Sequence, residues 1–69
     1  MTPVSLWAWI ATPAGGKPEY IVGAVVGDVA MPLVSAQRRL IDAAEPIAKE
    51  HGRREGVCVR VVRFVEAPP

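Results

Sequence analysis

The sequence predicts an α+β fold in which two strands, one helix and a third strand follow one another along the chain. Two apolar segments rich in aromatic and β-branched residues flank a loop with two prolines and two glycines, which is typical of paired strands. A segment with helical periodicity comes next, and a segment of alternating valines and polar residues follows it. With 69 residues and 51% hydrophobic content, the chain suits one compact domain over residues 1–69.

The first two strands are predicted over residues 4–11 and 20–27. The first segment (VSLWAWIA) ends where a Thr-Pro pair begins the loop of residues 12–18. The second segment (YIVGAVVG) can continue through residues 28–34 before the chain turns away. The two strands most simply form an antiparallel hairpin with a long loop.

A helix is predicted over residues 35–51, with Ser35 as its N-cap residue. Its apolar residues recur with the helical period and therefore fall on one arc of the helix surface. The residues on this arc are Ala36, Leu40, Ala43, Ala44, Ile47 and His51. Charged residues occupy the opposite side, at spacings that bring opposite charges together.

Pro46 interrupts this helical pattern. A proline inside a helix removes a hydrogen bond and clashes with the preceding turn, so we expect a kink, or a break at which Pro46 opens a second short helix. We expect Gly52 to end the helix in a left-handed conformation. Arg53 and Arg54 suit the negative end of the helix dipole.

The third strand is predicted over residues 57–66 (VCVRVVRFVE), where apolar and polar residues alternate. Alternation gives two faces, one with Val57, Val59, Val61, Arg63 and Val65 and the other with Cys58, Arg60, Val62, Phe64 and Glu66. A bulge near Val61 and Val62 would instead bring both arginines to the same side.

The order of the elements limits the topology of the sheet. A helical crossover makes the third strand parallel to the second and antiparallel to the first. The third strand can therefore pair beside the first, in the spatial order 2-1-3, or in parallel beside the second. We favour the order 2-1-3, because a central position explains why the first strand has almost no polar residues.

One helix covers only one face of a three-stranded sheet, so the other face needs a partner. We expect Leu6, Ala8 and Ile10 to pack beneath the helix, which leaves both tryptophans on the uncovered face. Burying an aromatic ring removes about 150–250 Å² from water and contributes about 4–6 kcal/mol, as much as the roughly 3–5 kcal/mol that so small a core supplies. The predicted dimer or partner interface comprises Trp7, Trp9, Val62 and Phe64. The alternative places both tryptophans beneath the helix as ordinary core residues.

Sequence signals for catalysis and for metal binding are weak. The segment Gly15-Gly16-Lys17 lacks the other residues of a phosphate-binding loop, since a proline follows the lysine. His51 and Cys58 are the only histidine and cysteine and have no ligand spacing, so we expect no metal and no cofactor. With a single imidazole base and little volume for a pocket, the protein is not expected to be an enzyme.

The charge balance does not indicate a nucleic-acid or membrane partner, since eight basic and seven acidic residues leave a net charge of +1. Four arginines close in sequence form a candidate charged surface for a partner, namely Arg53, Arg54, Arg60 and Arg63. With two tryptophans that can stack on bases, they make a small nucleic-acid-binding domain an alternative function. Acidic residues interleaved among them favour a solvated, ion-paired surface instead.

The overall profile of the chain is that of a solitary small domain with the order strand-strand-helix-strand and no catalytic residues. Its high content of Ala, Gly, Arg and Pro is typical of proteins encoded by GC-rich bacterial or phage genomes. In this profile the chain resembles the small inhibitor proteins of phages and mobile elements, anti-CRISPR proteins among them. The resemblance implies steric inhibition of a host protein or ribonucleoprotein complex, with the four arginines able to meet an acidic or nucleic-acid-binding surface.

The expected function is therefore that of a homodimeric, non-enzymatic interaction module. A lone cysteine and the lack of a membrane-spanning segment favour the reducing cytoplasm of a bacterial host. A structural assembly subunit is the third possibility, and it would form large oligomers rather than closed dimers.

Overall fold

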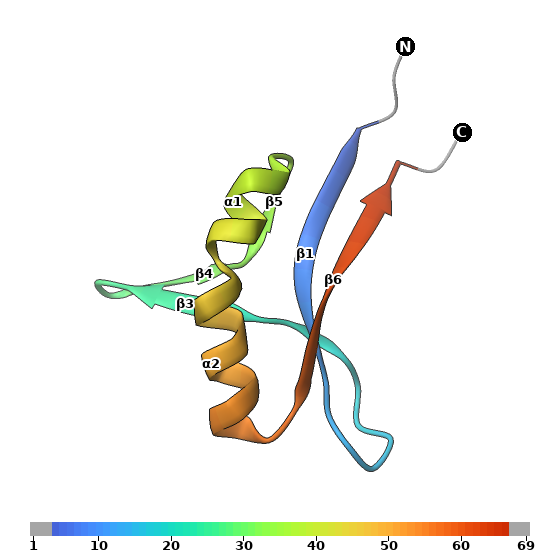
Figure 1. The fold of residues 1–69 in the computed structure, drawn as a ribbon, viewed down its shortest axis with the longest axis vertical. Coiled ribbons are helices and arrows are strands. Elements are labelled where there is room, and N and C mark those ends of the chain that lie inside the picture. The colour runs from blue at the N-terminus through green and yellow to red at the C-terminus, as the bar shows by residue number, and fades with distance from the viewer. Residues whose placement is uncertain (1–3, 67–69) are drawn as a thin grey trace.

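The structure is a computed structural model that describes residues 4–66 and contains a sheet, a protruding hairpin and two consecutive helices (Figure 1). The strands of this region are β1 (Ser5–Thr12), β2 (Tyr20–Ile21), β3 (Gly23–Val26), β4 (Val29–Pro32), β5 (Val34–Ser35) and β6 (Cys58–Val65). The helices are α1 (Arg38–Ala43) and α2 (Glu45–Glu55). The α+β class with antiparallel pairing is confirmed. The predicted three-stranded sheet with one helix differs in detail, because four strands form the sheet and two form the hairpin.

β1 is the central strand of the sheet, as predicted for the first strand. β6 pairs with it in antiparallel register along its whole length, from Ser5 to Thr12. The other edge of β1 is shared: β2 pairs with the part around Ala11, and β5 with the part around Trp7. β2 and β5 together therefore take the place of the predicted second strand beside β1.

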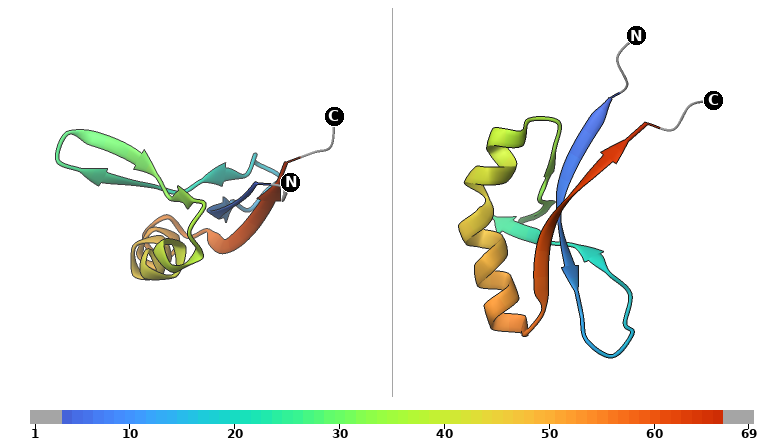
Figure 2. Two further views of the ribbon diagram at one scale, coloured as in Figure 1. Left: turned by 90° about the horizontal axis from the view of Figure 1, so that it is seen from above. Right: turned by 45° about the vertical axis from the view of Figure 1, so that its right-hand side comes forward.

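A two-stranded arm interrupts this shared edge. The chain leaves the sheet at Val22, runs out and back as β3 and β4, and returns at Leu33 (Figures 1 and 2). The backbone of Trp9 holds both ends: the Val22 N–H donates to the Trp9 carbonyl at 2.8 Å, and the Trp9 N–H donates to the Leu33 carbonyl at 3.1 Å. A bond from the Leu33 N–H to the Val22 carbonyl, 2.8 Å long, closes the base. We call residues 23–32 the arm.

The arm corrects the prediction of one continuous strand over residues 20–27. A two-residue turn, Gly27-Asp28, joins Val26 to Val29, and Gly27 has a φ of +61°. A positive φ at the first turn residue alone is typical of a type II′ hairpin turn, whose twist matches that of the paired strands. Because the turn is short and apolar residues flank it on both sides, the sequence suggested that residues 28–34 continue the second strand.

The helical segment breaks at Ala44, which confirms that the helix is broken near Pro46. Pro46 lies in the first turn of α2, where its missing N–H removes no helical hydrogen bond. The prediction that Gly52 ends the helix is wrong. Gly52 lies inside α2, and Gly56 ends the helix with a left-handed φ of +68°.

The two ends of the helical segment follow the prediction in part. α1 begins after Gln37, which occupies the N-cap position, so the predicted N-cap Ser35 lies two residues too early. The Ser35 hydroxyl instead accepts a hydrogen bond from the Gln37 N–H at 3.0 Å. Arg53 and Arg54 do lie in the last turn of α2, where their charges favour the helix dipole.

The tryptophans face the helices, which contradicts the predicted orientation of β1. Trp9 is only 5% exposed, and its indole N–H donates a hydrogen bond to the Ile41 carbonyl at 2.8 Å. Trp7 is partly buried and packs against the same core. The buried core cluster comprises Trp9, Ala11, Val22, Ile41 and Ala48. The alternative reading, in which the tryptophans are core residues, is therefore correct.

Small residues on α2 explain this orientation. Ala48 and Gly52 are the buried residues of α2, so the bulk between helix and sheet must come from the sheet, and an indole ring supplies it. Leu40 and Ile47, which belong to the predicted apolar arc of the helix and were expected to pack on the sheet, are about half exposed.

Candidate interaction surfaces

The sheet face opposite the helices carries a continuous apolar patch, which we call the open face. Residues directly opposite each other in paired strands point to the same side, so Leu6 lies beside Phe64, and Ala8 beside Val62. Figure 2 shows both helices on the other side of the ribbon formed by β1 and β6. The open face consists of Leu6, Ala8, Ile10, Ile21, Val34, Val62 and Phe64.

The periphery of the open face is strongly exposed. Leu6, Ile21 and Phe64 are 40%, 45% and 48% exposed, whereas the central Ala8 and Ile10 are shielded by their neighbours. Contiguous exposed apolar side chains of this kind mark binding surfaces in small soluble domains. The open face is therefore the leading candidate for a docking surface.

A polar cluster borders the open face. The Arg60 guanidinium donates to the Glu19 carboxylate and to the Thr12 hydroxyl, both at 2.6 Å, and that hydroxyl donates to Glu19 at 2.5 Å. Arg60 projects from β6 on the same side as Phe64, and Glu19 lies in the loop between β1 and β2. An apolar centre with a hydrogen-bonded polar rim is the usual anatomy of a protein interface.

The Glu19–Arg60 contact gives a stability that depends on pH. The hydrogen bond from Arg60, with a second from Thr12, lowers the pKa of the Glu19 carboxyl below its usual range. A lowered folded-state pKa adds stability above the pKa of the unfolded chain, and this contribution is lost as the pH falls through the folded-state value. We expect Glu19→Gln to reduce the melting temperature slightly at neutral pH and to have no effect in strong acid.

The measurement is a series of thermal melts of both proteins from neutral to acid pH. An Arg60→Ala background serves as the control, because without the guanidinium the Glu19→Gln change should keep only the smaller pH-dependent part that comes from Thr12. A melting difference that stays constant across the whole pH range would contradict this account.

A groove of about 600 Å³ lies between the arm and α2. One wall is β3, and the other is formed by α2 residues, namely Pro46, Ile47, Glu50, His51 and Arg54. The wall on α2 is thus apolar at the start of the helix and polar toward its end. The groove differs from the open face in being a concave site bordered by a strand edge.

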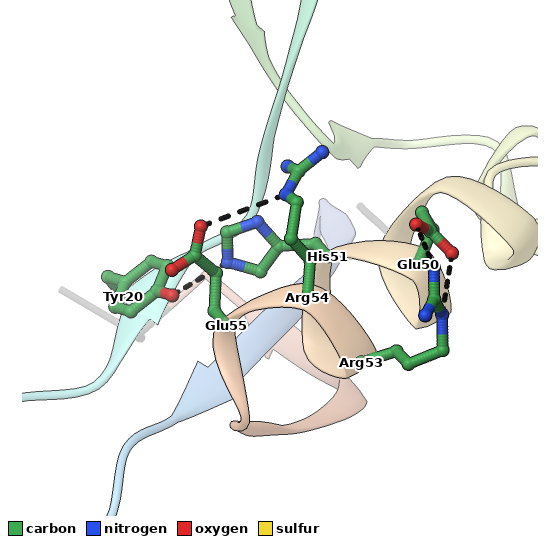
Figure 3. Close-up of polar contacts among 6 residues, drawn as sticks. All are labelled: Tyr20, Glu50, His51, Arg53, Arg54 and Glu55. Atoms are coloured by element: carbon green, nitrogen blue, oxygen red, sulfur yellow. Dashed lines mark hydrogen bonds and ion pairs between the residues drawn. The ribbon is translucent and has the colours of Figure 1, made fainter.

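The polar end of the groove is tied to the sheet by a tyrosine–histidine contact (Figure 3). The Tyr20 hydroxyl and the His51 Nε2 lie 2.7 Å apart, and their rings meet edge to face with centroids at 5.7 Å. Since Tyr20 belongs to β2 and His51 to α2, this contact fixes the helix against the edge of the sheet. It is the role that the structure gives to the only histidine of the chain.

The residues of the predicted interface fall on two different faces. Val62 and Phe64 belong to the open face, as predicted. Trp7 and Trp9 lie on the helix side, opposite Arg63 and Val61 of β6, so they do not line the open face. The predicted four-residue interface is therefore wrong as a unit.

The four arginines of the predicted charged surface are also separated. The register of β6 with β1 runs without a bulge, so Arg60 and Arg63 point to opposite faces. The Arg63 guanidinium lies over the Trp7 ring at 5.9 Å. Arg53 and Arg54 come from α2, where Arg53 contacts Glu50 at 2.5 Å and Arg54 contacts Glu55 at 3.8 Å. The predicted charged surface of Arg53, Arg54, Arg60 and Arg63 is therefore divided between α2 and the two faces of β6.

The aliphatic members of the open face and the exposed valines of the arm were not predicted from the sequence. One signal that identifies the covered face is the set Val57, Val59 and Val61, because three alternating valines directly after the helix suit its underside. The opposite set contains Arg60, whose charge does not fit beneath a helix. The Gly27-Asp28 pair between valines is the corresponding signal for the arm.

Within residues 4–66, no three His, Cys, Asp or Glu side chains are grouped so that they could hold a metal ion. Neither α1 nor α2 is long and apolar enough to cross a membrane. Comparison of the chain with protein-family models, with curated proteins and with solved structures found no match.

Proposed function

We propose that this protein is a non-enzymatic interaction module that forms a homodimer through its open face. The observation that carries the proposal is the contiguous exposure of Leu6, Ile21 and Phe64 on a sheet face that the helices leave uncovered. A two-fold dimer places the same patch on both sides of the interface, so that one apolar surface covers the other.

We further propose, from the resemblance to small phage inhibitors, that the dimer blocks a host macromolecular complex in a bacterial cytoplasm. A dimer formed through the open faces leaves both pairs of helices and both arms on the outside, where a target can reach them. Nucleic-acid binding is less well supported, because Arg60 and Arg63 lie on opposite faces of β6 and Arg60 is already paired with Glu19.

The experiment compares the molecular mass of the wild type with that of Phe64→Asp over a range of concentrations, by analytical ultracentrifugation. A carboxylate at an apolar interface costs several kcal/mol, and each ~1.4 kcal/mol is a tenfold change in affinity. We therefore expect the open-face association to weaken by a factor of about 100 or more.

Two leucines provide a matched comparison. Leu6→Asp changes an exposed leucine of the open face, and Leu40→Asp changes a similarly exposed leucine on α1. Leu6→Asp should weaken association as Phe64→Asp does, and Leu40→Asp should not. Wild-type protein that is monomeric at all concentrations would refute the dimer, as would equal effects of the two leucine variants.

A further inference from the structure

We infer that the groove between the arm and α2 binds the arm of a second copy of this chain. The protein then has a second self-association surface in addition to the open face. The two surfaces share no residue, so this inference and the proposed function hold or fail separately. Its support comes from the exposure of the arm, the free edge of β3 and the placement of charges in the groove.

The arm is a two-stranded ribbon whose large apolar side chains are mostly exposed. Val25 is 76% exposed, and Val26, Val29 and Met31 are also at least half exposed. A two-stranded hairpin alone is marginally stable in water, and it gains stability from a third strand or from packing on another element. Asp28 is the only charged residue of the arm. A further strand would extend its hydrogen-bonded ladder and place apolar side chains beside its valines.

β3 is the edge of the arm at which a further strand fits. β4 contains Pro32, which has no N–H to donate, whereas β3 contains no proline. The groove runs along β3, and the exposed Ile47 with its neighbour Pro46 forms the apolar part of the opposite wall. A strand that pairs with the free edge of β3 therefore lies in the groove, where its side chains contact Ile47.

A two-fold axis between two arms also matches their charges. Two identical strands related by such an axis pair antiparallel, so the tip of each arm lies beside the base of the other. Asp28 is at the tip, in the turn between β3 and β4. Arg54 and His51 lie beside the strand that leads from Tyr20 into the arm, near its base (Figure 3). Each Asp28 thus approaches Arg54 of the other copy.

Arg54 is well placed to receive this carboxylate. Glu50, the acidic residue of the groove, accepts two hydrogen bonds from Arg53, at 3.0 and 2.5 Å, so its charge is already compensated. Arg54 contacts Glu55 only at 3.8 Å, and both side chains are exposed. Such a long surface contact contributes little, so an incoming Asp28 can replace Glu55 as the partner.

Two self-complementary surfaces on one chain permit assemblies larger than a dimer. Two-fold axes that cross at right angles give a closed tetramer, axes that cross at other even divisions of 180° give larger closed assemblies, and axes that do not meet give an open chain. The arm contact would therefore give the protein the behaviour of a structural assembly subunit in addition to its proposed role as an interaction module.

Charge exchange in a Phe64→Asp background tests the arm contact alone. Phe64→Asp should remain a dimer held by its arms. Adding Asp28→Arg places two arginines together at each contact, and adding Arg54→Asp places two aspartates together. Each addition should weaken the remaining dimer by about tenfold, since both symmetric contacts become repulsive. An equimolar mixture of these two proteins restores opposite charges at both contacts and should dimerise again.

The masses distinguish every combination of outcomes, provided that circular dichroism shows each variant to be folded. Phe64→Asp that is monomeric, or a mixture that fails to dimerise, overturns the arm contact and leaves the open-face dimer standing. A wild-type dimer that Phe64→Asp leaves intact and Asp28→Arg dissociates supports the arm contact and overturns the open-face dimer. A monomeric wild type overturns both.

Discussion

Replacement of Trp9 by alanine is expected to leave most of the protein unfolded at ambient temperature. Trp9 is 5% exposed and belongs to the buried core cluster. Truncating a buried tryptophan costs about 3–5 kcal/mol. The core of a domain this small supplies about the same amount of net stability, roughly 3–5 kcal/mol. Far-UV circular dichroism and urea titration of Trp9→Ala would show the loss directly.

Trp9 has this effect because it connects three parts of the fold. Its backbone N–H and carbonyl hold Leu33 and Val22 at the base of the arm, and its indole N–H holds the Ile41 carbonyl of α1. The alanine variant keeps the backbone bonds and loses the ring. Trp9→Phe keeps most of the ring and loses only the indole N–H. Since the Ile41 carbonyl still accepts a hydrogen bond from the Ala44 N–H at 3.2 Å, this variant should cost about 0.5–1.5 kcal/mol, the net value of one hydrogen bond.

Trp7→Ala is the matched control for Trp9→Ala. Trp7 is the same residue type on the same face of β1, but it is partly exposed and its ring lies under the Arg63 guanidinium. Its truncation should leave a folded protein with reduced stability. Equal stabilities of Trp7→Ala and Trp9→Ala would contradict the central role assigned to Trp9.

The sequence predicts the order of the helices and strands better than it predicts which face of each strand is buried. Pro46 determines where the helical segment breaks, because a ring without an N–H fits only the first turn of a helix. The alternating valines determine β6. β1, by contrast, is apolar on both faces, and periodicity cannot say which of two apolar faces meets the helix. Ala48 and Gly52 decide the matter, since small helix residues leave room for Trp9.

The candidate surfaces were less predictable for the same reason. An uncovered apolar face follows from having helices on one side only, and Val62 and Phe64 were placed on it correctly. The arm could not be derived from alternation, because the apolar run of residues 20–34 looks continuous and only Gly27-Asp28 marks its turn. The separation of Arg60 and Arg63 depended on whether β6 has a bulge, and it has none.

Gly52→Ala is expected to destabilise the protein, although the same change inside an exposed helix stabilises it by about 0.5–1 kcal/mol. A Cβ atom at Gly52 would lie 2.9 Å from the Val57 carbonyl oxygen and 3.3 Å from the Val59 Cγ1. The first contact is too short for the two atoms to remain in place. Overpacking of this kind costs about 1–3 kcal/mol, which exceeds the gain in helix propensity. The melting temperature should fall by about 5–10 °C, since 1 kcal/mol corresponds to about 4–8 °C at this size.

The clash is costly to relieve, because Val57 and Val59 both lie where the chain passes from α2 into β6. The Val57 N–H donates to the Gly52 carbonyl at 3.0 Å, and β6 is held by its ladder with β1 from Cys58 onward. Gly56→Asn separates this effect from the general loss of a glycine: a Cβ there meets open space, and asparagine tolerates the left-handed φ of the helix end. Gly56→Asn should therefore change the melting temperature much less than Gly52→Ala. A rise in melting temperature for Gly52→Ala would mean that α2 is not held against β6 at this position, because helix propensity would then outweigh the contact.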